Sequence, residues 1–135
     1  MTTTPVPLIN EWLRFVVLRH HSSPDKTDHY DIGLEITRGD NSDDLSLDKL
    51  ECLELDLTTE TLGIEPQELI RRRYLYYEGL MRGNRGAVSR VDEGIYMITN
   101  SDKLIFRGKL LRGTYALSDD GERLFIKKVS EAIDL

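Results

Sequence analysis

Much of the chain alternates between apolar and polar residues with a period of two. In residues 29–36, Tyr, Ile, Leu and Ile share one face, and His, Asp, Gly and Glu share the other. This period is typical of a β-strand with one face against a core. Similar runs, or short apolar runs rich in β-forming residues, recur along the chain. The sequence predicts strands at 13–19, 29–36, 52–57, 94–98, 103–107, 112–117 and 122–128.

Turn-forming residues separate these runs, as in the polar segment 38–44 and the Asp-Asp-Gly of 119–121. The one predicted helix spans Glu65–Tyr74, with Pro66 near its first turn, acidic residues early and arginines late. About seven or eight short strands with little helix are typical of a compact antiparallel β-barrel. We therefore expect a mainly β fold with one short helix, forming a single domain over residues 1–135.

Composition narrows the class of protein. Hydrophobic residues make up 39% and charged residues 31% of the chain, and no apolar stretch approaches the roughly 20 residues that span a bilayer. The first residues lack the basic and apolar regions of a signal peptide. The single cysteine, Cys52, lies in an alternating run and is expected to pack as a small buried side chain. These features predict a cytoplasmic protein with no membrane partner.

Charge is distributed unevenly along the chain. The net charge of −6 argues against a generic nucleic-acid binder. Residues 1–70 hold 5 Lys and Arg against 15 Asp and Glu, whereas residues 71–135 hold 13 against 9. The two halves could simply complement each other, or they could place a basic surface beside an acidic metal pocket, as a phosphate ester substrate would require.

All the histidines of the chain fall in one short stretch, His20 to Asp31, which reads HHSSPDKTDHYD. Residues two apart on a strand lie roughly 7 Å apart, so His29 and Asp31 could lean toward one ion. His20, or His21 as the alternate, would complete a set of two imidazoles and one carboxylate from the preceding strand. Such a set suits manganese, iron or zinc and leaves coordination positions open. The alternative is that these polar residues only face solvent around a turn.

Other catalytic motifs are absent from the sequence. It contains no Gly-x-Ser-x-Gly nucleophile elbow, no phosphate-binding loop of the Walker type and no Gly-x-Gly-x-x-Gly fingerprint. The facial triad of iron-dependent oxygenases needs a second histidine far downstream of His-x-Asp, and no histidine follows His29. A metal site around the histidines is thus the strongest chemical candidate.

Several segments, taken in order, resemble the phosphoesterase domain of bacterial DNA ligase D. FVVLRH and HYDIGLE resemble that family's FVVQKH and HYDFRLE. Later, YLYYEG resembles a tyrosine-containing segment that ends in Glu-Gly, and LIFRGKLLRGTYAL with LFIKK resembles LHGEKLKGRYAL with WLLIKK. The likeness covers about residues 13–36 and 74–128, and it is similar to the shorter stand-alone branch of the family, whose corresponding strand is of the HFDLMLE type.

The resemblance implies a compact β-barrel that uses manganese, or alternatively zinc, to trim 3′ ends of DNA or RNA during end repair. Its metal ligands would be His20, His29 and Asp31, and the tyrosine near the scissile phosphate would be Tyr74. The partners implied are a nucleic-acid 3′ end and a DNA repair ligase or polymerase.

The chain departs from the family at two positions. The family's phosphate-binding arginine corresponds to Gly33, and its further catalytic histidine corresponds to Ile70. Loss of such a cation weakens transition-state stabilisation, so we expect weakened activity, or alternatively a non-catalytic module that binds nucleic-acid ends or a repair partner. A third alternative is a protein that acts only through protein contacts. The arginines that could take over phosphate binding are Arg71, Arg72 and Arg73 at the end of the predicted helix, and Arg82 and Arg85 in the next loop.

Overall fold

The protein is seen in a computed structural model, which describes residues 9–21, 28–36, 45–52, 55, 61–80, 86–99, 103–119, 121 and 124–130. The predicted β fold is confirmed. The strands are β1 (Leu13–His21), β2 (His29–Glu35), β3 (Leu45–Cys52), β4 (Thr61–Pro66), β5 (Ile70–Arg71), β6 (Gly79–Leu80), β7 (Ala87–Ile98), β8 (Lys103–Gly108), β9 (Arg112–Asp119) and β10 (Leu124–Ser130).

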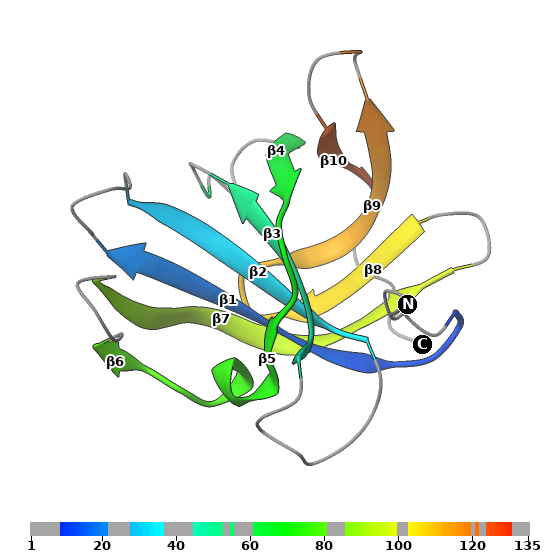
Figure 1. The fold of residues 1–135 in the computed structure, drawn as a ribbon. Coiled ribbons are helices and arrows are strands. Elements are labelled where there is room, and N and C mark those ends of the chain that lie inside the picture. Colours follow the sequence, from blue (N-terminus) through cyan, green and yellow to red (C-terminus); the bar gives the residue numbers. More distant parts are fainter. Residues whose placement is uncertain are drawn as a thin grey trace, which may run out of the picture.

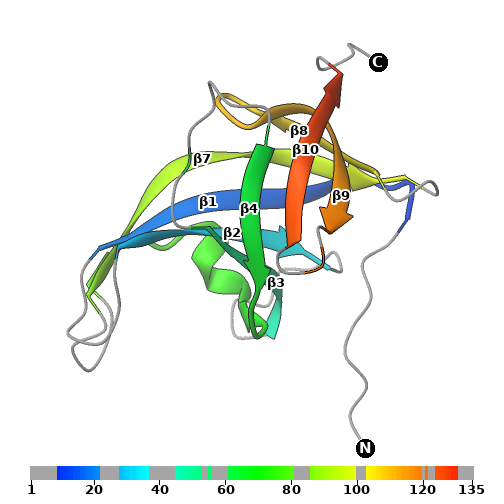
Figure 2. The same ribbon diagram turned by 90° about the horizontal axis from the view of Figure 1, so that it is seen from above.

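Eight of these strands close into an antiparallel barrel (Figure 1, Figure 2). Their order is β1-β2-β3-β4-β10-β9-β8-β7, and pairing of β7 with β1 closes the sheet. The register between β1 and β7 shifts between Val17 and Leu18, where β7 carries one additional residue. The two-residue strands β5 and β6 are appended to β3 and β7. Closure pairs both edges of the sheet, which an open sheet would leave exposed.

The barrel interior is built from the apolar positions of the alternating runs. Ile32 and Leu34 of β2 pack with Phe15 of β1 and Phe106 of β8 in one core cluster. The rings of Phe15 and Phe106 meet edge to face with centroids 5.1 Å apart, a favourable aromatic geometry. The alternation within each strand therefore decides which residues line the barrel.

A second apolar cluster covers part of the outer surface of the barrel. Val16 and Leu18, which alternate with the core residues of β1, pack with Leu47 of β3, Leu75 and Val88. Leu75 ends η1 (Arg72–Leu75), the only helix among the described residues. The chain between β4 and β6 thus folds back over the outer faces of β1, β2 and β3.

The helix predicted at Glu65–Tyr74 is largely wrong. Its first residues end β4, Ile70 and Arg71 form β5, and only a single 3₁₀ turn follows. Ile70 packs against the second apolar cluster and pairs with Leu47 of β3, so tertiary contacts override the local helical pattern. The sequence also missed β4, and it predicted only the end of β7, which begins at Ala87 rather than Gly94.

The loop predicted at 38–44 and the first residues of the strand predicted at 122–128 lie outside the described residues. Of the strand predicted at 52–57, only Cys52 and Leu55 are described: Cys52 ends β3, whose earlier residues the sequence missed, and Leu55 is in no strand. Within the described residues, no helix has the length and apolar character needed to cross a membrane.

A buried aspartate organises the turn between β8 and β9. The carboxylate of Asp92, on β7, accepts hydrogen bonds from the backbone N–H groups of Lys109, Leu110 and Leu111 at 2.7–3.0 Å. The side chain of Asp92 needs the space that a Cβ atom on Gly108 would occupy. The three hydrogen bonds explain why Asp92 can be buried here, because each hydrogen bond to a carboxylate offsets part of the cost of its desolvation.

Candidate metal centre

The pairing of β1 with β2 brings the predicted ligands together. His20 lies directly opposite His29, and Leu18 lies opposite Asp31. Residues opposite each other on antiparallel strands point to the same side of the sheet. The imidazole rings of His20 and His29 have centroids 4.8 Å apart. The three side chains therefore share the outer surface of the barrel, at the end of β1 and the start of β2.

The ligand atoms converge on a small volume. His29 Nε2 lies 3.2 Å from Asp31 Oδ1, and His20 Nδ1 lies 3.8 Å from Asp31 Oδ2. One ligand atom from each of the three residues falls within 4.8 Å of the others. Asp31 Oδ1 is buried and accepts no hydrogen bond from the described residues. Two imidazole nitrogens and a carboxylate so arranged could hold a divalent metal ion.

The site is more enclosed than a solvent-facing turn would be. His29 is 2% exposed and Asp31 is 6% exposed, which disfavours the alternative that these polar residues only face solvent around a turn. The reason is tertiary, because β1 and β3 flank this part of β2 and bring His20 and Glu51 against these two side chains. Burial makes an ionised carboxylate costly unless a cation or hydrogen-bond donors compensate it.

Glu51 is a potential ligand that the sequence reasoning missed. It lies opposite Asp31 on β3, and its Oε2 is 3.6 Å from His29 Nε2. Burial, and to a smaller extent the carboxylates of Asp31 and Glu51, raise the pKa of the Cys52 thiol to about 12. Alternation with the buried Cys52 could have placed Glu51 on an outer face, but only the β2–β3 register brings it beside Asp31.

His21, the alternate ligand, lies elsewhere. Its Nε2 is 2.9 Å from Ser89 Oγ of β7, because successive residues of a strand point to opposite sides. The group that could hold a metal ion contains His20 and not His21.

The two positions that depart from the resemblance are neighbours in space. A Cβ atom built on Gly33 would lie 3.7 Å from Ile70 Cδ1, 3.3 Å from Val16 Cγ1 and 3.4 Å from Leu47 Cδ1. Gly33 is on β2, two residues after Asp31. The surface beside the three ligands is therefore apolar, where the resemblance would place an arginine and a histidine.

The arginines predicted to bind phosphate have different positions. Arg71 is exposed at the end of β5. Arg73 lies over the rings of Tyr74 and Tyr77, 5.5 and 5.9 Å from their centroids. Arg85 lies outside the described residues. Arg73 thus contacts aromatic rings, and the phosphate-binding role of the three arginines stays a prediction.

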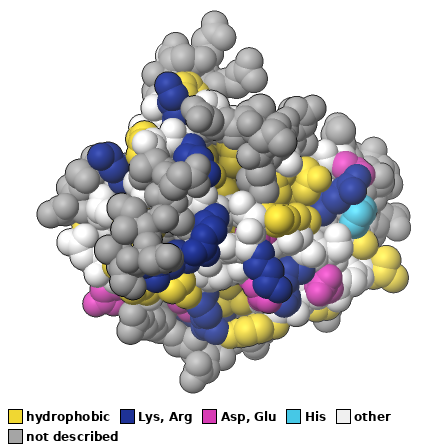
Figure 3. All heavy atoms as spheres, turned by 180° about the vertical axis from the view of Figure 1, so that it is seen from behind, with side chains coloured by type: hydrophobic (Ala, Val, Ile, Leu, Met, Phe, Trp, Pro, Cys, Tyr) yellow, Lys and Arg dark blue, Asp and Glu magenta, His cyan; other side chains and the backbone are white. Residues whose placement is uncertain are grey.

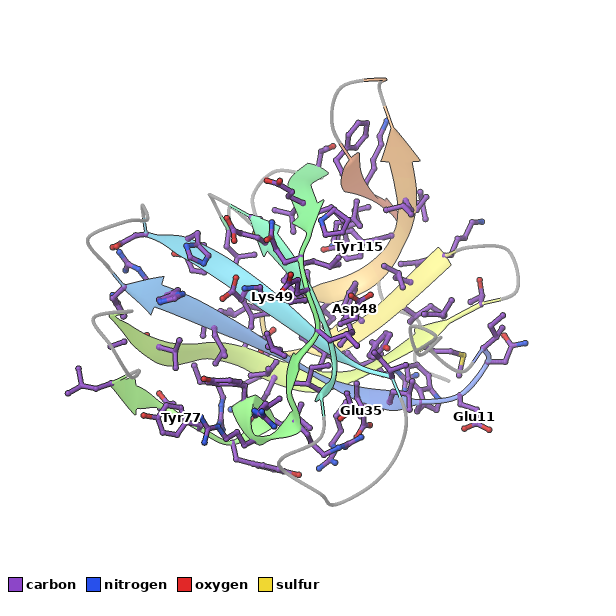
Figure 4. The ribbon with its side chains drawn as sticks, in the orientation of Figure 1. Glu11, Glu35, Asp48, Lys49, Tyr77 and Tyr115 are labelled. Carbon is purple, nitrogen blue, oxygen red and sulfur yellow. The ribbon has the colours of Figure 1, made fainter. Side chains whose placement is uncertain are left out.

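Arg72, between them, is a structural residue. It is 1% exposed and donates a hydrogen bond from Nη1 to Glu35 Oε2. Glu35 lies at the end of β2 (Figure 4), and Arg14 of β1 binds it through Nε, Nη2 and the backbone N–H. Burial alone would raise the pKa of Glu35, but the hydrogen bonds from Arg14 and Arg72 outweigh it and hold that pKa below its usual value.

Tyr74 lies on the same outer surface as the ligands. It packs against the second apolar cluster, to which Leu18 belongs, and Leu18 is directly opposite Asp31. Its ring meets that of Tyr77 edge to face at 5.8 Å. Tyr74 is half-buried, so its position beside the cluster agrees with the predicted neighbourhood, whereas its catalytic role stays a prediction.

In comparisons with known proteins, no family model matches the chain and no curated protein matches its sequence.

Proposed function

We propose that the protein is a metal-dependent phosphoesterase-like protein that acts on 3′ ends of nucleic acid in DNA end repair, with weakened activity. The observation that carries this proposal is the convergence of His20, His29 and Asp31, which could hold a metal ion. The ordered sequence resemblance to the phosphoesterase domain of DNA ligase D supplies the substrate class. A cytoplasmic location and a ligase or polymerase partner remain predictions.

Mixed nitrogen and oxygen ligands favour manganese, with zinc as the alternative. Glu51 would add a second carboxylate 3.6 Å from His29 Nε2. Carboxylate oxygens suit manganese, whereas two histidines with a single carboxylate also form catalytic zinc sites. A bound divalent ion would polarise a phosphoryl oxygen or lower the pKa of bound water. His20, His29 and Asp31 would hold it, and Tyr74 would lie near the phosphate.

Titration of the protein with Mn²⁺, measured by calorimetry, tests the candidate metal centre. Wild type is expected to bind Mn²⁺, and His29→Ala to weaken binding by at least about 100-fold, because loss of a residue that merely orients a ligand already costs about 10–100-fold. His21→Ala is the matched control, since it removes the adjacent histidine on the other side of β1. Absence of binding by wild type, or equal affinity in His29→Ala, would contradict the proposal.

Activity is measured on a 3′-phosphate-ended primer–template with Mn²⁺. Slow release of phosphate by wild type, lost in His29→Ala and kept in His21→Ala, is the expected result. The weakness follows from the apolar contact between positions 33 and 70, because a preorganised cation at the scissile phosphate commonly supplies several kcal/mol of transition-state stabilisation.

The same apolar contact favours a second candidate, a non-catalytic barrel that binds nucleic-acid ends or a repair partner. In that case the protein binds DNA without turnover, and His29→Ala binds it as well as wild type does. The two candidates are therefore separated by whether His29 matters for any nucleic-acid reaction.

A further inference from the structure

A group of cations lies on the wall of the barrel formed by β8, β9 and β10, outside the candidate metal centre. Arg107 of β8 lies directly opposite Arg112 of β9. Lys103 of β8 and Lys127 of β10 both lie opposite Ala116 of β9, one on each side of it. We call these four residues, Lys103, Arg107, Arg112 and Lys127, the basic face.

Alternation shows that the basic face points outward. Phe106 and Tyr115, which neighbour these positions along β8 and β9, belong to the barrel core. Residues of the opposite parity therefore face away from the core. Lys103, Arg112 and Lys127 are exposed and Arg107 is partly exposed. Figure 3 shows the molecule from behind, where Lys and Arg side chains recur across the surface.

Acidic residues are few in the strands of the basic face, and among β8, β9 and β10 only Asp119 occurs, at the end of β9. No Asp or Glu occurs in residues 103–118 or 124–130. On the neighbouring strand β7, the carboxylate of Glu93 is 3.2 Å from Arg90. Like charges directly opposite each other on a sheet repel, so the pair of Arg107 and Arg112 concentrates positive charge at this place on the wall.

An aromatic ring adjoins the basic face. The guanidinium of Arg107 lies 4.7 Å from the ring centroid of Trp12, which is within the range of a cation–π contact. Cations combined with an aromatic side chain are typical of surfaces that bind a nucleic-acid strand, where cations contact phosphates and rings stack on bases.

The overall net charge of −6 does not prevent such binding. Asp31 of β2 and Glu51 of β3 lie at least three strands away from β8 and β9 in the order around the barrel, whereas Glu65 lies on β4, which pairs with β10. The Debye length is about 8 Å at physiological ionic strength, so a distant acidic wall is largely screened from an anion at the basic face.

We infer that the basic face binds the phosphate backbone of a nucleic-acid strand, with Trp12 at its edge. This inference names a docking surface for the substrate class of the proposed function and rests on it to that extent. It requires no metal ion, because the face and the candidate metal centre lie on different strands.

Fluorescence anisotropy with a labelled 20-nucleotide single strand, in EDTA and about 50 mM salt, tests the inference. Arg107→Gln/Arg112→Gln is expected to weaken binding at least tenfold. It should also reduce the slope of log affinity against log salt by about 0.7 for each cation removed. Arg19→Gln/Arg90→Gln removes the same charge from two arginines that are ion-paired with Asp28 and Glu93 outside the basic face, and it should affect binding much less. Bound strand should also change the fluorescence of Trp12, the only tryptophan.

Three results would overturn the inference: no binding by wild type at low salt, equal losses in the two double variants, or binding of phosphatidylserine vesicles without binding of oligonucleotides. Circular dichroism of each variant confirms the fold. If the protein binds the strand but not Mn²⁺, this inference stands and the proposed metal chemistry is wrong. If it binds Mn²⁺ but not the strand, the metal centre stands and this inference is wrong.

Discussion

Two polar clusters lie on the same outer face of β1 and β2 and differ in how their carboxylates are compensated. At one end, Glu35 lies between the guanidinium groups of Arg14 and Arg72. At the other end, Asp31 contacts the imidazoles of His20 and His29 and faces Glu51 across β3. The first cluster pairs an anion with permanent cations, whereas the second pairs anions with imidazoles, which are metal ligands.

Asp31 and Glu35, four residues apart on β2, therefore have different roles: one belongs to a candidate functional site and the other stabilises the fold. A buried carboxylate bound to arginines supports the fold without any ligand, because its charge is already balanced. A buried carboxylate beside imidazoles and a second carboxylate is best balanced by a divalent cation. The same strand pair therefore holds a structural ion cluster and a candidate metal centre.

The largest expected effect comes from breaking the first cluster. Glu35→Gln should lower the free energy of unfolding by about 3–5 kcal/mol, because it leaves the buried Arg72 without its anion. Asp31→Asn, the matched change at the other end, should alter the stability of protein in EDTA by less than about 1 kcal/mol, since it relieves the opposition to Glu51. Urea unfolding measures both values. Equal losses in the two variants would show that the clusters are both structural.

A smaller effect is expected when metal is added. A ligand at 100 times its dissociation constant stabilises the folded state by about 2.7 kcal/mol. Mn²⁺ should therefore raise the melting temperature of wild type and of His21→Ala, and leave that of Asp31→Asn unchanged. Thermal scans with and without EDTA provide the measurement. A shift that persists in Asp31→Asn would place the bound ion outside the candidate centre.

The smallest effect should appear in the pH dependence of stability. Because the folded-state pKa of Glu35 is lowered from its ordinary value of 4.5, its contribution is present above that value and is lost as the pH falls through the lowered folded-state pKa. The difference in urea midpoint between wild type and Glu35→Gln should thus be constant near neutrality and shrink in acid. A difference that grows in acid would contradict the assigned direction of the shift.

The fold class could be predicted from the sequence because alternation is a local property. The period of two in 29–36 put Ile32 and Leu34 in the core and His29 and Asp31 on the other face, as observed. The segment 65–74 failed because its residues favour a helix locally, while Ile70 finds a better apolar environment against Val16 and Leu47. That environment comes from strands distant in the sequence.

The candidate ligands could be found for a similar reason. His29 and Asp31 are two apart on one strand, and a turn joins them to His20, so spacing and hairpin geometry suffice to bring them near each other. The choice between His20 and His21 depended on the register of β1 with β2, which pairs His20 with His29. Glu51 could not be found without the pairing of β2 with β3.

By itself, the sequence determined that the protein is built from alternating strands, which faces are apolar, and that all its histidines lie beside one aspartate. Only the tertiary structure decided that this face is buried, that Glu51 joins it and that Arg72 belongs to Glu35. The physical reason is that alternation assigns a residue to a face, while register and covering elements assign its neighbours. HHSSPDKTDHYD supplies the ligands, and the closed barrel brings them within 4.8 Å of one another.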